Sequence, residues 1–265
     1  MNTVAPPASS NINTSTSALQ ARLDSNNRFS AVDFQTWLFE RLAPRAGMDV
    51  LDVGCGTGAQ SLRLLDAVGA QGSVSALDLS AASVEGLVAK AAGRGKLQAV
   101  VSGMDDLGKV IAGQFAVKQY DLAQSTYALY YAADPVRVLD AMRAALKPDG
   151  RLAVCVPNHP HGLVELIRRF GPIPKPVDDC NFFPVQVLDP YFRRHFVQVT
   201  VHLLRNTQRV PSVEEVMVFL RNAAYFNPAT ADQVAAAVAE EIARHGYFTY
   251  DKHSYLIIGC NSDAG

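Results

Sequence analysis

The chain has 265 residues, of which 49% are hydrophobic and 18% charged, and its formal net charge is −1. This length suits one large domain, or one domain with a cap, and the composition is ordinary for a globular protein with a substantial core. A nearly neutral charge provides no broad basic surface, so nucleic acid is not favoured as a partner. The sequence contains no run of 18 apolar residues, and a membrane span is not predicted.

The N-terminal residues 1–27 are rich in Ser and Thr and contain no apolar core, which predicts a disordered tail rather than a signal peptide. The four cysteines are Cys55, Cys155, Cys180 and Cys260, and they form no C-x-x-C pair. The sequence therefore predicts no metal site. Free thiols suit a reducing compartment, and we expect a cytoplasmic protein.

Apolar residues at helical spacing predict a helix within residues 28–47, which would act as an N-terminal cap. Short apolar runs then alternate with amphipathic segments through residues 48–157, which predicts a parallel sheet covered by helices on both faces. The predicted strands are Val50–Val53, Val74–Leu77, Leu97–Val101, Tyr120–Ala123 and Leu152–Val156. The helices between them begin near Gly58, Ser80, Met104 and Asp134, and Ser80 and Asp134 are suitable N-cap residues.

The last hundred residues have a different pattern. The predicted helices are Gly162–Phe170, Leu188–Phe196, Val213–Ala224 and Ala231–His245, and the predicted strands are Val197–Leu204 and Phe248–Gly259. Capping patterns at Ser212 and Thr230, with Gly246 after the last helix, support these boundaries. The proline-rich residues 171–184 are predicted to form a loop. Residues 158–265 would thus supply a helical lid and two antiparallel strands at the sheet edge.

A glycine-rich turn follows the first predicted strand. From Asp52 the sequence reads D-x-G-x-G-x-G, with glycines at Gly54, Gly56 and Gly58. Glycine permits backbone conformations that a Cβ forbids, and it lets a ligand approach the main chain closely. The spacing differs from the G-x-G-x-x-G of dinucleotide dehydrogenases, so a pyrophosphate pocket fits less well. The acid before the first glycine suits a ligand that carries an ammonium group.

A second acid, Asp78, ends the next predicted strand, twenty residues after Gly58. A carboxylate at this position can accept hydrogen bonds from both hydroxyls of a ribose. The alternative is that Asp78 only begins a turn. We favour the ribose contact, because both the position and the spacing match the plan of a nucleoside-binding site.

Four motifs together resemble the class I S-adenosylmethionine (SAM)-dependent methyltransferases of the small-molecule type 11 group. They are DVLDVGCGTG, the acid of LDLS, YDLAQSTYAL and LKPDGRLAV, and they follow the family order within residues 48–157. The resemblance implies a Rossmann-like α/β fold, a three-layer sandwich around a seven-stranded, mostly parallel sheet with one antiparallel edge strand and a helical lid. It also implies SAM as cofactor and S-adenosylhomocysteine (SAH) as product.

The resemblance also assigns cofactor residues. The methionyl end of SAM would be held by Asp52, Gly54, Cys55, Gly56 and Gly58, the ribose by Asp78, and the adenine would lie beside Leu79. Family members often have an aspartate after the third strand that contacts the adenine amino group, and Gly103 takes its place here. Met104 or Asp105 would then make this contact, although Asp105 and Asp106 also fit a simple acidic helix start.

The loop after the fourth predicted strand begins with Gln124 and Ser125, which the resemblance places against the methionine of SAM. Three tyrosines follow within reach of the sulfonium or the acceptor: Tyr127, Tyr130 and Tyr131. An aromatic face stabilises a nearby cation by about 0.5–2 kcal/mol. The alternative that at least two of these tyrosines only pack is favoured. Trp37 and Phe183 are further candidates for the acceptor pocket.

The loop after the fifth predicted strand contains His159 and His161, which we consider, with Tyr131, as candidate catalytic residues. For each histidine alone, a structural or solvated role is the favoured alternative. Methyl transfer from a sulfonium is already activated, so positioning and exclusion of water can supply much of the rate without a strong base. No metal cluster is visible in the sequence.

The sequence therefore predicts an enzyme of biosynthesis that moves a methyl group from SAM to an O, N or C atom of a small, apolar or aromatic metabolite. Its partner would be that small molecule, with no nucleic acid and no membrane span, and the protein would be a monomer or homodimer. The alternatives are a methyltransferase acting on a macromolecule, a non-catalytic SAM-fold binding module, and a nicotinamide oxidoreductase, which the glycine spacing disfavours.

Overall fold

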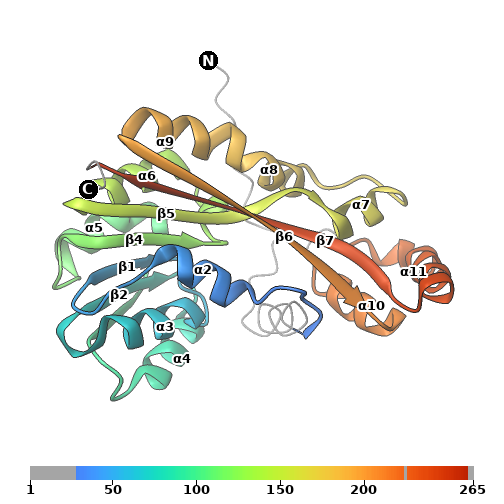
Figure 1. Ribbon diagram of the computed structural model, residues 1–265, viewed down its shortest axis with the longest axis horizontal. Helices are drawn as coiled ribbons and strands as arrows, with labels where there is room; N and C mark the ends of the chain where they lie inside the picture. The colour runs from blue at the N-terminus through green and yellow to red at the C-terminus, as the bar shows by residue number, and fades with distance from the viewer. Residues whose placement is uncertain (1–27, 224–225, 262–265) are drawn as a thin grey trace.

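The computed structural model describes residues 28–223 and 226–261, so the predicted tail over residues 1–27 lies outside the described residues. Within them, seven strands form one sheet in the order β3-β2-β1-β4-β5-β7-β6 (Figure 1). The strands are β1 (Asp49–Val53), β2 (Ser73–Asp78), β3 (Leu97–Val101), β4 (Tyr120–Thr126), β5 (Leu146–His161), β6 (Gln198–Val210) and β7 (Phe248–Cys260). The first five strands run parallel, and β7 runs antiparallel to both of its neighbours.

This arrangement confirms the expected Rossmann-like fold and the antiparallel pair at the sheet edge, with one refinement. The reversed strand itself is β7, which lies one place in from the edge because β6 pairs outside it. Leu256 and Ile257 are neighbours on β7, so they face opposite sides of the sheet, and neither is exposed to solvent. A strand that is apolar on both faces suits an interior position, whereas β6 leaves Leu203 largely exposed.

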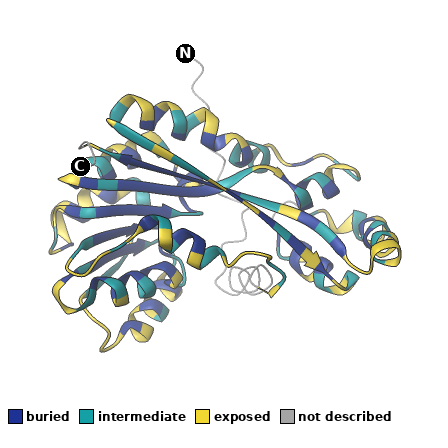
Figure 2. Ribbon diagram, viewed as in Figure 1, coloured by how far each residue is buried: buried dark blue, intermediate teal, exposed yellow. Residues whose placement is uncertain are grey.

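Helices cover both faces of the sheet, which makes the three layers visible in Figure 1. The helices are α2 (Phe34–Leu42), α3 (Ala59–Val68), α4 (Ala81–Ala91), α5 (Leu107–Gly113), α6 (Pro135–Ala144), α7 (Gly162–Arg168), α8 (Lys175–Phe183), α9 (Asp189–His195), α10 (Val213–Arg221) and α11 (Ala231–His245). Alternate residues of each strand point to opposite faces, so Val50 joins the apolar cluster under α2 and α3, and Leu51 joins the cluster under α5, α6 and α9. Figure 2 shows the central strands β1 and β4 and the middle of β5 mostly buried, whereas β6 at the sheet edge is largely intermediate or exposed.

Most of the predicted helix boundaries depend on side-chain caps that the structure contains. The side chains of Ser80, Asp134 and Ser212 each accept a hydrogen bond from a backbone N–H in the first turn of their helix. Gly246 ends α11 in the left-handed conformation, as predicted. The predicted cap at Thr230 is wrong, because its hydroxyl donates backwards to the carbonyl oxygen of Asn227 instead of accepting from the helix.

The prediction of a loop over residues 171–184 is also wrong. Lys175–Phe183 forms α8, which continues through a short π-helical turn, Pro184–Leu188, into α9. Pro174 stands at the N-cap and Pro176 in the first turn, where the missing backbone N–H has no helical partner to lose. The prolines therefore mark where this helix begins, and they do not prevent it.

A separate apolar cluster lies beyond the carboxyl ends of the parallel strands. It joins α7, α10 and α11 to the far ends of β6 and β7, which project past the rest of the sheet (Figure 1). Leu163, Leu220 and Val234, one from each helix, are fully buried in it. This group of helices, which we call the lid, therefore has a core of its own.

The segment just before α2 runs along the outer side of β6. The backbone N–H of Ala31 donates to the carbonyl oxygen of Thr207, and Ser30 forms an isolated bridge with Gln208. The buried side chain of Asn206 accepts from the N–H of Val32 and donates to the Val32 carbonyl oxygen and to the Ser30 hydroxyl. This segment covers the edge strand at that point and closes one side of the cavity described below.

Candidate active site

A cavity of about 850 Å³ opens at the carboxyl ends of the parallel strands, where open α/β sheets bind their ligands. One end is formed by the glycine-rich turn and by the loops after β2, β3 and β4. This cofactor end contains Asp52, Gly54, Cys55, Gly56, Thr57, Asp78, Leu79, Met104 and Asp105. The opposite, acceptor end is formed by the segment before α2 and the start of α2, by the end of β5, and by β6, β7 and α10. It contains Ser30, Phe34, His161, Leu204, Asn206, Phe219, Lys252 and Ser254.

Two glycines of the turn are required by close packing. Gly54 has φ +76°, and a Cβ there would lie 2.3 Å from the Cβ of Ala128 in the loop after β4. Gly58 has φ +83°, and a Cβ there would lie 2.4 Å from the Cδ1 of Leu87. The turn is thus pressed against two neighbouring elements and lines the cavity, and the N–H groups of Gly54 and Cys55 both donate to the carbonyl oxygen of Leu77.

Asp52 lies under this turn and is 1% exposed. Its two carboxylate oxygens accept hydrogen bonds from the Ser61 hydroxyl at 2.5 Å and from the side-chain amide of Gln124 at 2.5 Å. Burial, aided by the nearby charge of Asp78, raises the pKa of this carboxyl to about 7, although the two hydrogen bonds oppose the shift. The side chain therefore joins β1 to α3 and β4, and a cation in the cavity would favour its charged form.

Asp78 lies at the end of β2, as the sequence predicted, and borders the cavity. One carboxylate oxygen accepts from the N–H of Gly56 at 2.7 Å, and the other accepts from the N–H of Ser80 at 2.9 Å. Each oxygen retains lone-pair capacity for a further donor such as a ribose hydroxyl. Two carboxylate oxygens that can accept hydrogen bonds beside the glycine-rich turn fit the nucleoside part of SAM.

An apolar surface continues from Asp78 along the wall of the cavity. Leu79 is 77% exposed beside it, and Gly103 and Met104 line the same end. A large apolar side chain so exposed in a cavity favours contact with a flat ligand, and the adenine ring of SAM fits there.

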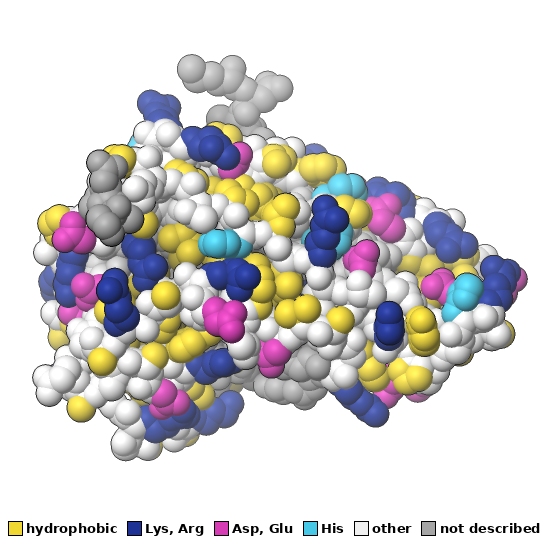
Figure 3. All heavy atoms as spheres, viewed as in Figure 1, with side chains coloured by type: hydrophobic (Ala, Val, Ile, Leu, Met, Phe, Trp, Pro, Cys, Tyr) yellow, Lys and Arg dark blue, Asp and Glu magenta, His cyan; other side chains and the backbone are white. Residues whose placement is uncertain are grey.

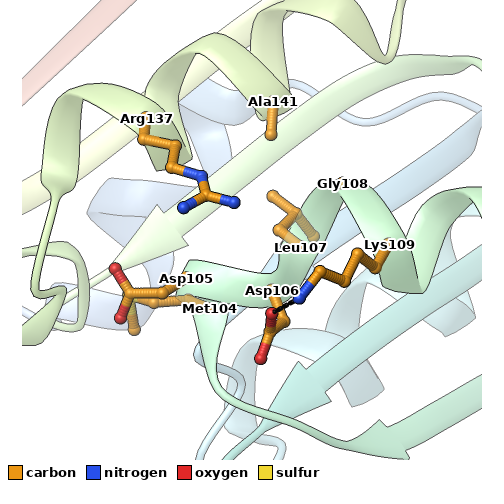
Figure 4. Close-up of a pocket in the computed structure, with 8 residues that line it drawn as sticks. All are labelled: Met104, Asp105, Asp106, Leu107, Gly108, Lys109, Arg137 and Ala141. Atoms are coloured by element: carbon orange, nitrogen blue, oxygen red, sulfur yellow. Dashed lines mark hydrogen bonds and ion pairs between the residues drawn. The ribbon is translucent and has the colours of Figure 1, made fainter.

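The two acids after Gly103 have different surroundings. The carboxylate of Asp105 accepts from the N–H groups of Ala133 and Asp134, and it thereby ties its turn to the start of α6. Asp106 forms an ion pair with Lys109 beside a second, small pocket of about 70 Å³ (Figure 4). Asp105 therefore borders the main cavity while already engaged, and Asp106 faces away from it.

Gln124 and Ser125 lie on β4, and neither side chain lines the cavity. Both are buried, with the Gln124 amide on Asp52 and the Ser125 hydroxyl on the carbonyl oxygen of Val53. The next two residues, Thr126 and Tyr127, line the cavity instead. The strand extends beyond the predicted Ala123 to Thr126, which keeps Gln124 and Ser125 inside the sheet.

Tyr127 lines the cavity and is held in a rare backbone conformation. Its φ is +54°, in the left-handed region that non-glycine residues seldom adopt. Its N–H donates to the carbonyl oxygen of Cys155, its hydroxyl is 2.7 Å from the Ser254 Oγ, and its ring meets Phe34 edge-on at 5.5 Å. Burial raises the pKa of its phenol above the ordinary range, so Tyr127 acts as a neutral wall and hydrogen-bond partner. Strain held by so many contacts is characteristic of functional sites.

The other predicted aromatic residues divide into two groups. Tyr130 and Tyr131 line the cavity, and their rings lie 4.5 Å apart. Phe183 packs behind Tyr130 at 6.3 Å and does not line the cavity, and Trp37 is buried with the Arg41 guanidinium over its ring. Phe34, one turn before Trp37, reaches the cavity in its place because the inner face of α2 is shared between the sheet and the site.

The two candidate histidines are separated by the structure. His159 is exposed and stacks on Phe182 at 5.2 Å, outside the cavity. His161 is 9% exposed, lines the cavity and stacks on Tyr250 at 6.4 Å. Burial, aided by the charge of Lys252, lowers the pKa of His161 to about 3, so the imidazole is neutral at physiological pH. A group with this pKa is a weak base, which argues against His161 as a proton acceptor.

The sequence did not indicate the residues of β6 and β7 that form much of the acceptor end. These are Leu204, Asn206, Lys252 and Ser254, which alternate along their strands toward the cavity. The alternation of residues along each strand predicts which side chains share a face of the sheet. It does not predict which face of the two edge strands lines a ligand site.

Comparison with known proteins supports this reading of the fold. A family model described as a methyltransferase domain matches residues 28–196, more than half of the chain. The chain is 31% identical over 128 residues to the nocamycin O-methyltransferase of Saccharothrix syringae, covering 48% of this chain and 44% of that protein. It is 32% identical over 136 residues to the demethylmenaquinone methyltransferase of Shouchella clausii, covering 49% and 55%. The chain thus spans about half the length of the curated relatives it matches.

The crystal structure of a putative methyltransferase from Bacillus halodurans superposes with a TM-score of 0.61 at 13% identity, covering 87% of this chain and 99% of that one. At this identity the likeness concerns the fold. The chain therefore belongs to the family of methyltransferase domains, with the fold of the class I SAM-dependent methyltransferases and SAM as its cofactor.

Proposed function

We propose that the protein transfers a methyl group from SAM to an O, N or C atom of a small, apolar or aromatic metabolite. The observation that carries this proposal is the division of one cavity into an acidic end with a glycine cradle and an acceptor end walled by aromatic side chains. The named relatives that act on nocamycin and demethylmenaquinone support a small-molecule acceptor.

At the cofactor end, the backbone of Gly54, Cys55 and Gly56 would contact the methionyl part of SAM, and the carboxylate of Asp78 would accept the ribose hydroxyls. The charge of Asp52 would favour the cationic ligand from beneath the turn. Leu79 and Met104 would hold the adenine ring, with Asp105 at its rim. Gln124 and Ser125 would support this end from the interior rather than touch the cofactor.

SAM supplies a methyl group that is already activated by the positive sulfur. The residues of the chain then have to orient the acceptor and exclude water. Tyr127 would separate the two ends of the cavity, Phe34 and Phe219 would cover the acceptor, and Tyr131 would lie at the opening. Neutral His161 would position the acceptor by a hydrogen bond, whereas His159 lies outside the cavity and would have no catalytic role.

Two alternatives are less well supported. A methyltransferase for nucleic acid would need a basic face, and Figure 3 shows Lys and Arg side chains interspersed with Asp and Glu over the visible face. A non-catalytic module would have no need for the set of Asp52, Asp78 and the strained Tyr127 around one cavity.

The test is calorimetric titration of the protein with SAM, SAH and NAD, on the wild type and on Asp78→Ala. Loss of two charge-assisted hydrogen bonds predicts at least about tenfold weaker binding of both SAM species. Asp66→Ala, which breaks an exposed ion pair with Arg94, is the matched control and should bind as the wild type does. Absence of SAM binding by a folded wild type, or binding that is indifferent to Asp78, would refute the proposal.

We further infer that residues 48–157 form the SAM-binding core, with 28–47 as a cap and 158–265 as lid and sheet edge. The separate apolar cluster of the lid supports this division. The four cysteines of the chain are free thiols, which supports the proposal of a cytoplasmic protein. We also propose that it is an enzyme of biosynthesis and a monomer or homodimer. Among the described residues, no helix is both long and apolar enough to cross a membrane.

A further inference from the structure

A row of polar side chains crosses three strands at the acceptor end of the cavity. The strand register aligns Asn206 of β6 with Lys252 of β7, and Lys252 with His161 at the end of β5. All three residues line the cavity. Residues opposite each other on paired strands project from the same face, so the sheet itself holds this row together.

Lys252 gives the acceptor end a charge opposite to that of the cofactor end. Among the described residues that line the cavity, it is the only lysine or arginine. Its Nζ lies 5.3 Å from the centroid of the Tyr127 ring. The carboxylates of Asp52, Asp78 and Asp105 all belong to the other end. A cationic ligand is thus favoured at one end and an anionic one at the other.

His161 contributes a buried, polar side chain to this row. Its side chain is more than nine-tenths buried, and its Nδ1 has no hydrogen-bond partner among the described residues. Buried polar atoms are rarely left unpaired in folded proteins. Since the imidazole is neutral, it can exchange a hydrogen bond with a ligand but cannot keep a proton taken from it.

The walls around this pair are apolar and partly aromatic. Phe34, Tyr127, Leu204 and Phe219 line the acceptor end from four different elements. Such a surrounding favours a flat, apolar ring, and it strengthens the attraction between a buried cation and an anion.

We propose that Lys252 and His161 bind the methyl acceptor as the anion of an acidic hydroxyl on an aromatic or enolic ring. This inference rests on the proposed methyltransferase function. The hydroxyl proton leaves to solvent on binding, with Lys252 holding the resulting oxyanion and His161 hydrogen-bonding to it or to a neighbouring oxygen of the ring. An electron pair of the oxyanion forms the bond to the methyl carbon, and the sulfur keeps the electrons of the bond that breaks. Anion and sulfonium become neutral products, and Lys252 keeps its proton throughout.

The probe is 4-nitrophenol, with a bicyclic hydroxynaphthoquinone as a larger second probe, titrated into the full chain saturated with SAH. The ionised form of each probe has its own absorption band, so the pH midpoint of its ionisation can be followed when bound. We expect the wild type to lower this midpoint by about one to two pH units, as an opposite charge at close range does.

The two residues are expected to differ in their effects. Lys252→Met should return the midpoint to its free value and weaken binding at least about tenfold, and Lys252→Arg should retain most of the shift. His161→Phe keeps an aromatic ring against Tyr250, and it should weaken binding with little change in midpoint. Lys109→Met, at an exposed position on α5, is the control and should behave as the wild type does.

SAH titration of each variant separates the possible failures. The variants should bind SAH as the wild type does, because neither residue lies at the cofactor end. If the wild type fails to bind SAH, the proposed function itself is wrong. If SAH binds but neither probe shows a shifted midpoint, or if Lys252→Met leaves the shift intact, the oxyanion site is refuted. Tighter binding of benzoate than of both phenolic probes would assign the site to carboxylates and also overturn the proposal.

Discussion

The two ends of the cavity are built in different ways. The cofactor end consists of turns that directly follow β1, β2, β3 and β4, so its geometry depends on short sequence stretches and on the backbone. The acceptor end consists of side chains from β6, β7, α10 and the segment before α2, which are brought together only by the sheet edge and the lid. The cofactor end should therefore resist changes in the lid, whereas the acceptor end should depend on them.

The largest effect is expected from Gly54→Ala at the cofactor end. Left-handed strain and the clash with Ala128 should together lower the free energy of unfolding by about 2–5 kcal/mol. SAH affinity should fall by at least about 100-fold, as the turn must move to make room. Urea unfolding and calorimetry measure both effects. Gly86→Ala on α4, where a Cβ meets nothing within 4 Å, is the control, and equal behaviour of the two variants would contradict the packing argument.

Leu220→Ala tests the independence of the lid. Leu220 is fully buried in the lid core and does not line the cavity, so its truncation should cost about 2–5 kcal/mol. Hydrogen exchange should accelerate mainly in α7, α10 and α11, with SAH affinity preserved. Leu64→Ala, equally buried under the sheet, is the counterpart and should loosen β1 and β2 instead. Uniform acceleration in both variants would show that the two regions unfold as one.

A moderate effect is expected from Asn206→Ala, which releases the segment before α2 from β6. The substitution removes three hydrogen bonds to Ser30 and Val32 and should cost about 1–3 kcal/mol. Exchange of the Ala31 amide should accelerate, and the KM for the acceptor should rise without loss of SAH affinity. Thr207→Ala, which removes one exposed bond to Asp251, should change stability by less than about 0.5 kcal/mol. Similar losses in both variants would argue against this role of Asn206.

A further effect is a difference in pH dependence. Since burial lowers the folded-state pKa of His161 to about 3, its contribution to stability is complete above the unfolded value near 6.5 and is lost as the pH falls toward 3. Lys252 and His253 add to this shift. Asp52 has the opposite sign, because a pKa raised to about 7 makes the folded state less stable as the pH rises from about 4 to 7.

Urea unfolding between pH 4 and 7 should therefore show His161→Phe losing stability less steeply on acidification than the wild type. The difference in slope is at most about 1.4 kcal/mol per pH unit. Identical slopes would mean that His161 binds its proton equally in the folded and the unfolded chain, and the lowered pKa that keeps the imidazole neutral would then be refuted.

Local patterns were sufficient for the sheet and for most of the cofactor end. Strand and helix order, the caps at Ser80 and Asp134, and the positions of Asp52 and Asp78 all follow from short-range chemistry, because a turn after a buried strand needs particular residues at particular spacings. The helix over Lys175–Phe183 was missed because prolines at a helix start look the same as prolines in a loop.

Only the tertiary structure decided which side chains reach the cavity. Gln124 and Ser125 are turned inward because β4 continues past them, and His161 rather than His159 enters the site because the end of β5 pairs with Lys252. Phe34, Asn206 and Lys252 come from strands and helices that are distant along the chain. Sequence spacing governs the backbone of a turn directly, but the meeting of distant side chains depends on strand order, register and the face that each strand presents.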